Sequence, residues 1–261
     1  MYTPEMIKAY LERIGLTYDP ERPLDAGYLR DLQYAHCTTV PYENLDIVER
    51  IPLKLDAESL YDKIVTRGRG GYCFELNGAF GVLLSSIGWD VTEYLARYLR
   101  GETEIPMRRH RVLRVKCGSL SYMCDVGVGQ SAPREPLIIQ EGLEQTQVSP
   151  DGSVKETYRF SRDDFLGWVL SDFHKGEWRR YFSFTTEPQL PIDFEMPSCW
   201  CEYSPDSPFT KKISLSLKTP NGRITVDGNA FRIFEGDNVT ETILSVDALE
   251  TIIAERFGIR R

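Results

Sequence analysis

The sequence contains few histidines and no cysteine pair of the C-x-x-C type, so it offers little from which to build a structural metal site. Only three of its 261 residues are histidine, and six are cysteine: Cys37, Cys73, Cys117, Cys124, Cys199 and Cys201. A zinc site would need ligands from distant segments, and disulfide frameworks are typical of small secreted domains. Because 41% of the residues are hydrophobic, this chain can bury a core of its own. We therefore expect reduced thiols and no bound metal.

Long uncharged apolar runs are absent as well. No segment approaches the roughly 18 apolar residues that a membrane-spanning helix needs. The segment Met1–Tyr10 contains Glu5 and Lys8, which interrupt the apolar run that a secretory signal requires. The net charge of −8 repels nucleic acid, whose backbone is also negative. We expect a cytoplasmic protein with no membrane and no nucleic-acid partner.

The sequence also lacks low-complexity tracts, and its apolar periodicity divides it into three regions. In residues 1–89, Thr3 is placed to cap a helix that ends at Gly15, and Asp25 and Asp56 are placed to cap two more. Each capping residue precedes apolar residues at helical spacing. We predict that this region forms a helical bundle.

In residues 90–191 the pattern becomes that of β-strands. The segments Val91–Leu99, His110–Cys117 and Leu120–Val126 are rich in Val, Leu and Tyr, which is typical of strands. Gly118-Ser119 lies between the last two, as expected for a tight hairpin turn. We predict a curled antiparallel sheet or β-barrel.

Residues 192–261 form the third region, which begins with a proline-rich stretch. A hairpin is predicted at Asn221-Gly222, and Ser245 is placed to cap a last helix that Gly258 ends. We therefore predict that this region forms an α/β unit. The fold class predicted for the whole chain is α+β.

The segment Arg69-Gly70-Gly71-Tyr72-Cys73 precedes the most regular helical pattern in the chain. Apolar residues follow at the spacing of one helix face, namely Leu76, Ala79, Phe80, Leu83, Leu84 and Ile87, and Gly88 ends the pattern. This places Cys73 in the first turn of a buried helix. The amide groups and dipole of a helix N-terminus stabilise a thiolate, so we expect a lowered thiol pKa and a nucleophilic cysteine. The alternative is a small buried hydrophobic side chain.

A base and an acid follow on neighbouring predicted strands. His110 opens one strand and Asp125 ends the next, and the hairpin between them brings the strands side by side. Cysteine, histidine and a carboxylate form the general arrangement for nucleophilic acyl transfer, in which the acid orients the imidazole. Taken singly, His110 could be an ordinary polar strand residue and Asp125 a turn residue.

Several segments resemble the arylamine N-acetyltransferase family. The matching pairs are Pro41-Tyr42-Glu43-Asn44-Leu45 with P-F-E-N-L, Arg69-Gly70-Gly71-Tyr72-Cys73 with R-G-G-x-C, His110 through Val115 with H-x-x-L-x-V, Asp125-Val126-Gly127-Val128-Gly129 with D-V-G-F-G, and more weakly Ser204 through Phe209 with S-P-x-S-x-F. The resemblance implies an N-terminal helical bundle, a central antiparallel β-barrel and a C-terminal α/β lid. It also implies a cysteine-protease-like triad of Cys73, His110 and Asp125 where the first two domains meet.

The resemblance further implies a ping-pong reaction. Cys73 would take acetyl from acetyl-CoA and pass it to an arylamine or a hydrazine. Gly127 and Gly129 would let the pantetheine arm approach the backbone, and Arg109 and Ser207 would lie near the ligands.

Two positions that line the family's acceptor pocket differ from its usual pattern. Tyr42 and Val128 stand where the family commonly has phenylalanine, so they are candidate substrate-binding residues. A basic stretch could meet the cofactor phosphates or form a solvated strand face; its members are Arg97, Arg100, Arg108, Arg109, Arg111 and Arg114.

Two other functions remain open on the sequence. A cysteine hydrolase or transglutaminase-like enzyme would use the same three groups. A non-catalytic protein could instead use its cysteines as thiol or metal ligands.

Overall fold

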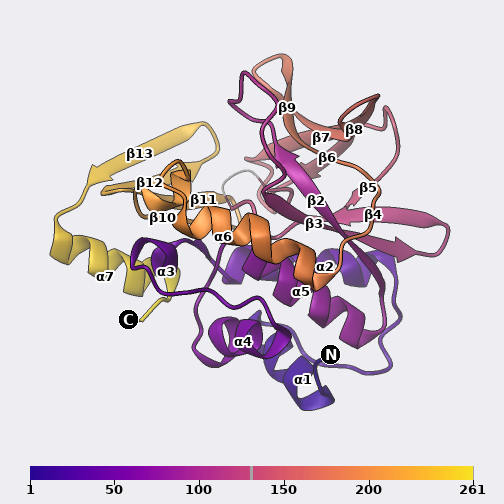
Figure 1. The fold of residues 1–261 in the computed structure, drawn as a ribbon, viewed down its shortest axis with the longest axis horizontal. Helices are drawn as coiled ribbons and strands as arrows, with labels where there is room; N and C mark the ends of the chain where they lie inside the picture. The colour runs from indigo at the N-terminus through magenta and orange to yellow at the C-terminus, as the bar shows by residue number, and fades with distance from the viewer. Residues whose placement is uncertain (130–131, 261) are drawn as a thin grey trace.

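The structure is a computed structural model that describes residues 1–129 and 132–260. The helices among these residues are α1 (Pro4–Arg13), α2 (Ala26–Thr39), α3 (Leu45–Val48), α4 (Ala57–Tyr61), α5 (Cys73–Ile87), α6 (Glu195–Tyr203) and α7 (Val246–Phe257), with the π-helical turn η1 (Asp62–Thr66) and the 3-10 turns η2 (Pro191–Phe194) and η3 (Pro208–Thr210). The strands are β1 (Tyr42–Glu43), β2 (Asp90–Tyr98), β3 (His110–Cys117), β4 (Leu120–Cys124), β5 (Leu137–Ile138), β6 (Gln145–Val148), β7 (Lys155–Asp163), β8 (Gly167–His174), β9 (Glu177–Phe184), β10 (Ser214–Thr219), β11 (Gly222–Asp227), β12 (Ala230–Glu235) and β13 (Asn238–Ile243). Figure 1 shows the long curled sheet on one side, the second sheet with α7 on the other, and α1, α4 and α5 below and between them.

The predicted helix caps are confirmed by side-chain hydrogen bonds. The side chains of Thr3, Asp25, Asp56 and Ser245 each accept a bond from a backbone N–H in the first turn of α1, α2, α4 and α7. Such bonds satisfy donors that the helix itself leaves free. Gly88 ends α5 in the left-handed conformation, with φ 117°.

The helix that Asp56 caps is short, because after Tyr61 it widens into the π turn η1. This turn carries Lys63, which is buried with its Nζ 2.7 Å from both Asp46 Oδ2 and Glu75 Oε1. A buried ammonium group needs such partners. The wider turn therefore accompanies an internal ion-pair cluster next to the start of α5.

The larger sheet has eight strands in the order β5-β4-β3-β2-β9-β8-β7-β6, and neighbouring strands run antiparallel. It curls into a nearly closed barrel around an apolar interior that includes Phe160 and Phe182. Between its two edge strands, the side chain of Gln145 donates to the carbonyl of Ile138 (3.0 Å) and accepts from its N–H (2.7 Å). One amide side chain thus replaces part of the missing strand ladder.

The smaller sheet has five strands in the order β1-β10-β11-β12-β13. Its first strand comes from the N-terminal region, where Tyr42 pairs with Ser216. Beside it, Asn44 Nδ2 donates to the carbonyls of Phe209 (2.8 Å) and Lys212 (2.9 Å). The first and third regions therefore share one sheet. We propose domain boundaries between residues 89 and 90 and between residues 191 and 192. The smaller sheet joins the regions before the first boundary and after the second.

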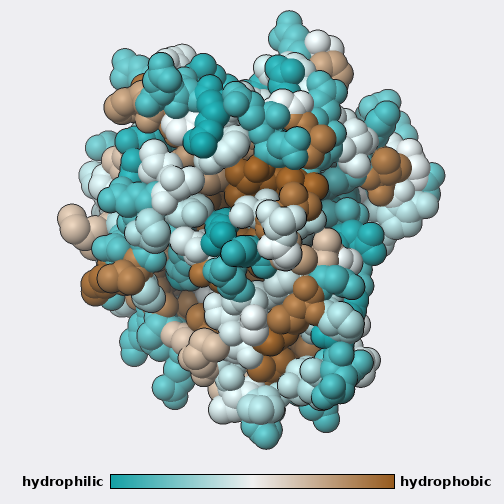
Figure 2. Space-filling model, turned by 90° about the vertical axis from the view of Figure 1, so that its right-hand side faces the viewer, coloured by the Kyte–Doolittle hydropathy of each residue, from teal (hydrophilic) through white to brown (hydrophobic). Residues whose placement is uncertain are grey.

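Helix α5 lies at the centre of the fold, and its apolar side chains pack in one core with those of α1, α2 and β3. This places the N-terminus of α5 where the helices, the barrel and the smaller sheet meet. On the β4 side of the molecule the surface is largely hydrophilic, and apolar residues form separate patches (Figure 2). Among the described helices, none is both long enough and apolar enough to cross a membrane.

Candidate active site

Cys73 is the first residue of α5, and the chain just before it packs closely against the backbone at Pro41. A side chain on Gly70 would clash, because its Cβ would lie 2.0 Å from the carbonyl oxygen of Pro41. Glu75 Oε2 accepts a hydrogen bond from the Tyr72 N–H at 3.1 Å, which fixes the start of the helix. The Cys73 side chain is buried and its Sγ donates to the carbonyl of Arg109 at 3.7 Å.

His110 and Asp125 meet as their positions on the β3–β4 hairpin predict. His110 Nε2 lies 2.7 Å from Asp125 Oδ2, and both side chains are buried. A carboxylate accepts hydrogen bonds, so Nε2 is the donor and Nδ1 is the nitrogen left to take a proton. The acid therefore fixes both the orientation and the tautomer of the ring.

Asn77 joins the cysteine helix to this pair, a role that the sequence analysis did not assign. Its Nδ2 donates to the carbonyl of Arg111 (2.6 Å) and to Asp125 Oδ1 (2.8 Å), and its Oδ1 accepts from the Val126 N–H (2.9 Å). One turn separates Asn77 from Cys73, so both lie on the same helix face. The one-turn spacing between Cys73 and Asn77 is visible in the sequence and could have indicated this role.

The pKa of Cys73 departs from the expectation of a lowered value. Burial raises the pKa of this thiol well above its usual range, and the charge of Asp125 acts in the same direction. Backbone N–H groups of Arg111 and Phe74 oppose the rise but are outweighed, because a thiolate removed from water loses its hydration. In these surroundings the thiolate needs a positive partner.

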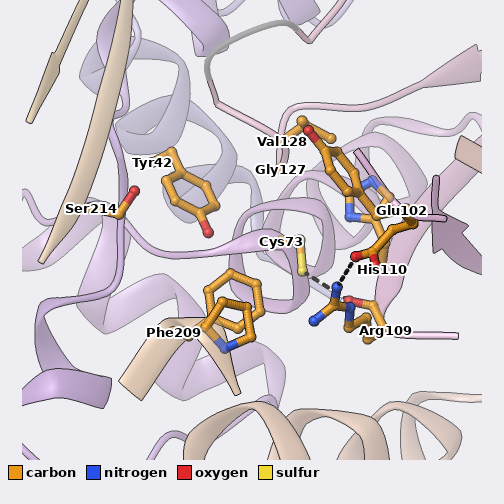
Figure 3. Close-up of a pocket in the computed structure, with 11 residues that line it drawn as sticks. Tyr42, Cys73, Glu102, Arg109, His110, Gly127, Val128, Phe209 and Ser214 are labelled. Atoms are coloured by element: carbon orange, nitrogen blue, oxygen red, sulfur yellow. Dashed lines mark hydrogen bonds and ion pairs between the residues drawn. The ribbon is translucent and has the colours of Figure 1, made fainter. Parts of the chain in front are cut away.

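A cavity of about 340 Å³ lies over the cysteine. Its lining residues are Tyr42, Cys73, Tyr98, Glu102, Arg109, His110, Gly127, Val128, Pro208, Phe209 and Ser214. Figure 3 shows Cys73 in the middle of them, with Tyr42 and Phe209 on one side and His110 and Arg109 on the other. The structure therefore gathers six of the nine predicted site residues around one space, while Asp125 lies behind His110.

Gly127 and Gly129 differ in their positions. A Cβ on Gly127 would lie 2.7 Å from the Cys73 Cα, so the turn after Asp125 needs glycine to pack against the cysteine helix. Gly129 has φ 74° and lies beside the Tyr42 ring, but it does not line the cavity.

Ser207 also lies outside the cavity lining. It is fully buried, and its hydroxyl donates to the carbonyl of Cys201 at 2.6 Å and accepts from the Phe209 N–H at 3.3 Å. Its hydrogen bonds hold the segment before η3. The structure therefore gives Ser207 a supporting position behind the cavity residues Pro208 and Phe209.

The basic stretch does not form an open phosphate-binding patch. Its arginines pair with acidic residues in the pairs Arg100–Asp172, Arg108–Glu187, Arg109–Glu102, Arg111–Glu93 and Arg114–Asp90. Arg97 donates to the carbonyl of Pro106. The acidic partners come from other strands and loops, so spacing along one strand could not reveal them.

The six cysteines are free thiols, and only Cys199 among them is exposed. Within the described residues, no group of three or more His, Cys, Asp or Glu side chains is arranged to hold a metal ion.

Comparisons with known proteins show the family to which the chain is similar. A family described as N-acetyltransferase matches residues 25–260. The arylamine N-acetyltransferase of Mycolicibacterium smegmatis is 34% identical to this chain, and the match covers 96% of this chain and 90% of that protein. The structure of the Salmonella typhimurium arylamine N-acetyltransferase has a TM-score of 0.91 at 27% identity, covering 99% and 92% of the two chains.

A second similar structure is that of the Mycobacterium marinum arylamine N-acetyltransferase in complex with CoA. It has a TM-score of 0.87 at 30% identity and covers 97% of this chain and 92% of that one. The family match extends through the cysteine helix, the His–Asp hairpin and the smaller sheet. The chain therefore belongs to the arylamine N-acetyltransferase family and is an acyltransferase.

Proposed function

We propose that the protein moves an acetyl group from acetyl-CoA, through a thioester on Cys73, to the nitrogen of an arylamine or a hydrazine. The observation that carries this proposal is the shared cavity of Cys73 and His110, with Asp125 2.7 Å behind the imidazole. The similar M. marinum enzyme in complex with CoA supports the choice of donor.

In the first half-reaction, His110 takes the proton of the Cys73 thiol as Sγ attacks the acetyl carbonyl. The carbon–sulfur bond to CoA then breaks, and the CoA sulfur leaves with the proton that His110 returns. Because burial raises the pKa of the thiol, the thiolate forms as half of an ion pair with imidazolium. Asp125 stabilises the positive half of that pair.

In the second half-reaction, a neutral amine nitrogen attacks the thioester carbonyl. The bond to Cys73 Sγ breaks, and a proton from the nitrogen passes through His110 to the cysteine sulfur. An amide is released and the free thiol returns. Water must be kept from the thioester in the meantime, a role that suits the aromatic side chains of Tyr42, Tyr98 and Phe209 around it.

The remaining site residues divide between the two substrates. We assign Gly127 and Arg109, which line the cavity, to the pantetheine arm of the donor. Tyr42 and Val128 line the same cavity and are assigned to the acceptor. Gly129 and Ser207 support these residues from behind.

Mass spectrometry of the protein after incubation with acetyl-CoA alone tests the proposal. One acetyl group should appear on Cys73, and it should leave when an arylamine is added. Cys73→Ala should remove the signal, whereas Cys199→Ser, a change at the exposed cysteine, should keep it. Acetyl-CoA consumption that proceeds equally well without an amine would indicate a hydrolase instead.

A further inference from the structure

A second buried lysine lies where the barrel meets the smaller sheet. The Lys218 side chain, on β10, is 3% exposed, and its Nζ lies 3.4 Å from Glu156 Oε1 on β7. The same carboxylate also faces Arg134, whose Nε lies 3.4 Å from Glu156 Oε2. Among the residues that the structure describes, Glu156 is the only acid paired with either cation.

The first buried lysine shows which partners an internal ammonium group has elsewhere in this protein. Lys63 is 6% exposed, and its Nζ lies 2.7 Å from each of two carboxylates, those of Asp46 and Glu75. Lys218 is buried at least as deeply, yet it shares one carboxylate with an arginine, at a longer distance. A buried charge is costly without close partners, and an ammonium group has three donors. Lys218 therefore has donors left for a further acceptor.

Positive charge also exceeds negative charge around Lys218. Burial lowers the pKa of Lys218, and the charges of Arg134 and Arg223 act in the same direction, against the charge of Glu156. The Nη groups of Arg134 donate to backbone carbonyls around the β10–β11 turn, and Arg223 lies over the ring of Phe234. Neither arrangement supplies a negative charge. Three cations therefore lie around a single carboxylate.

A small cavity lies beside this lysine. Its volume is about 10 Å³, and Lys218 and Ser216, which lie on the same face of β10, are part of its wall. The Ser216 Oγ atom is buried and has no hydrogen-bond partner among the described residues. Cys37 of α2 and Tyr42 also line this space, and Tyr42 lines the cavity over Cys73 as well (Figure 3). The space suits one ligand of the size of a water molecule or a small ion.

No side chain among the described lining residues supplies the missing negative charge. Burial raises the pKa of Cys37 to about 12 and that of Tyr42 well above its usual range, so both side chains are neutral at physiological pH. Apart from Ser216 and Lys218, the other described lining residues are apolar or glycine. The compensating charge therefore has to come from a ligand.

We propose that this cavity is a binding site for a small monovalent anion of the size of chloride. The anion accepts hydrogen bonds from Lys218 Nζ and Ser216 Oγ, and it reduces the excess of positive charge that the arginines create. A water molecule would fill the same space but leave that excess in place. The site is separate from the acetyl-transfer chemistry. Because Lys218 also pairs with Glu156 of the barrel, a bound anion should stabilise the junction between the barrel and the smaller sheet.

Bromide identifies the ligand, because it resembles chloride in charge and size and its anomalous X-ray scattering distinguishes it from water. Crystals of the wild-type protein soaked in sodium bromide should show an anomalous peak in the cavity, within hydrogen-bonding distance of Lys218 Nζ and Ser216 Oγ. Peaks at the protein surface alone would indicate an adventitious ion only and would overturn the proposal. A water molecule in the cavity without an anomalous signal would do the same.

Thermal unfolding in sodium chloride and in sodium gluconate of equal ionic strength measures binding in solution, since gluconate is far larger than the cavity. The melting temperature of the wild type should be higher in chloride by about 3–5 °C once free chloride is about tenfold above its Kd. Lys218→Met should lose this difference, and Ser216→Ala should reduce it. Any difference that remains in Lys218→Met is a general effect of the two salts.

The matched control is Lys116→Met, the same change at an exposed position of β3, which should keep the wild-type response to chloride. A Lys218→Met protein that responds to chloride as the wild type and Lys116→Met do would contradict the proposal. If Lys218→Met fails to fold, the bromide map of the wild type and the response of Ser216→Ala still decide the question.

Discussion

At the scale of single residues, the proposed chemistry depends on one proton that moves between Cys73 and His110. Burial raises the pKa of Cys73, so without a positive neighbour the thiolate should appear only at a pH well above the ordinary value of roughly 8.5. In the proposed mechanism, the imidazolium of His110 supplies that neighbour. The helix N-terminus alone is insufficient at this depth of burial.

His110→Gln should therefore make the thiol slow to alkylate at neutral pH. The rate should rise only in strongly alkaline solution, because an acid with a raised pKa loses its proton at higher pH. The rate of iodoacetamide labelling at Cys73, followed by peptide mass spectrometry from about pH 5 to about pH 10, measures this change. Identical profiles for the variant and the wild type would show that the imidazole does not ionise the thiol.

At the scale of secondary-structure elements, Asn77 connects three of them: α5, β3 and the turn after β4. Asn77→Ala would leave the carbonyl of Arg111, the carboxylate of Asp125 and the N–H of Val126 without these partners. The expected loss in the free energy of unfolding is about 2–4 kcal/mol, since each buried polar group left unpaired is costly. Acetylation of Cys73 should slow as well.

Urea unfolding and single-turnover acetylation of the same Asn77→Ala sample measure these two effects. Asn77→Asp is a useful second variant, because it keeps the size but places a second carboxylate beside Asp125. It should impair acetylation at least as much. An Asn77→Ala protein with wild-type stability and rate would show that the hydrogen bonds are dispensable.

The packing of α1 on α2 predicts a pH dependence of stability. His36 Nε2 lies 3.0 Å from the Tyr10 hydroxyl, and burial, aided by the charge of Arg13, lowers the pKa of His36 to about 3. The unfolded chain takes up this proton near pH ~6.5, but the folded chain does so only near the lowered value. Stability should therefore fall as the pH drops between these values, by up to about 1.4 kcal/mol per pH unit.

Chemical denaturation of the wild type and His36→Gln at several pH values from neutral to acid isolates this contribution. The variant should lose the part of the acid slope that belongs to residue 36. His174→Gln, at an exposed position, serves as the comparison. Slight burial and the charges of Arg179 and Lys175 lower the pKa of His174 as well, but its shift is smaller than that of the buried His36, so this variant should lose less of the slope than His36→Gln. Equal slopes for all three proteins would contradict the assignment.

Local signals in the sequence predicted much of this architecture. Helix caps such as Thr3 act within one turn, and the β3–β4 hairpin brings His110 to Asp125 with little chain between them. The pairing of Tyr42 with Ser216, which joins distant segments, left no local signal. The pairing of Arg109 with Glu102 joins residues close in sequence, but it depends on how the loop between them folds, which the sequence pattern did not indicate. The raised pKa of Cys73 was likewise missed, because burial depends on the whole fold.

At the scale of the whole molecule, the smaller sheet makes the N-terminal and C-terminal regions interdependent. A fragment of residues 1–191 would lose the strand that pairs with β1 and the C-terminal bonding partners of Asn44. It would also expose Leu45, which packs in the core of the smaller sheet. We expect this fragment to lack cooperative thermal unfolding, in contrast to the full chain.

Circular dichroism during heating tests this expectation. A sharp transition in the fragment at the melting temperature of the full chain would mean that the first two regions form an independent unit. The same sample can be tested for acetylation at Cys73, which we expect to be lost, because Pro208, Phe209 and Ser214 complete the cavity wall.

The composition of the cavity wall also determines when the site can form during protein synthesis. It draws on residues from Tyr42 to Ser214, so the ribosome has made most of the chain before the pocket can close. Until then the cavity wall lacks Pro208, Phe209 and Ser214, so we expect the Cys73 thiol to be more exposed to water and its pKa to lie nearer the ordinary value of a thiol. Enzymatic competence therefore arrives late in translation, and a premature stop before residue 214 yields a chain with the nucleophile but no enclosed site.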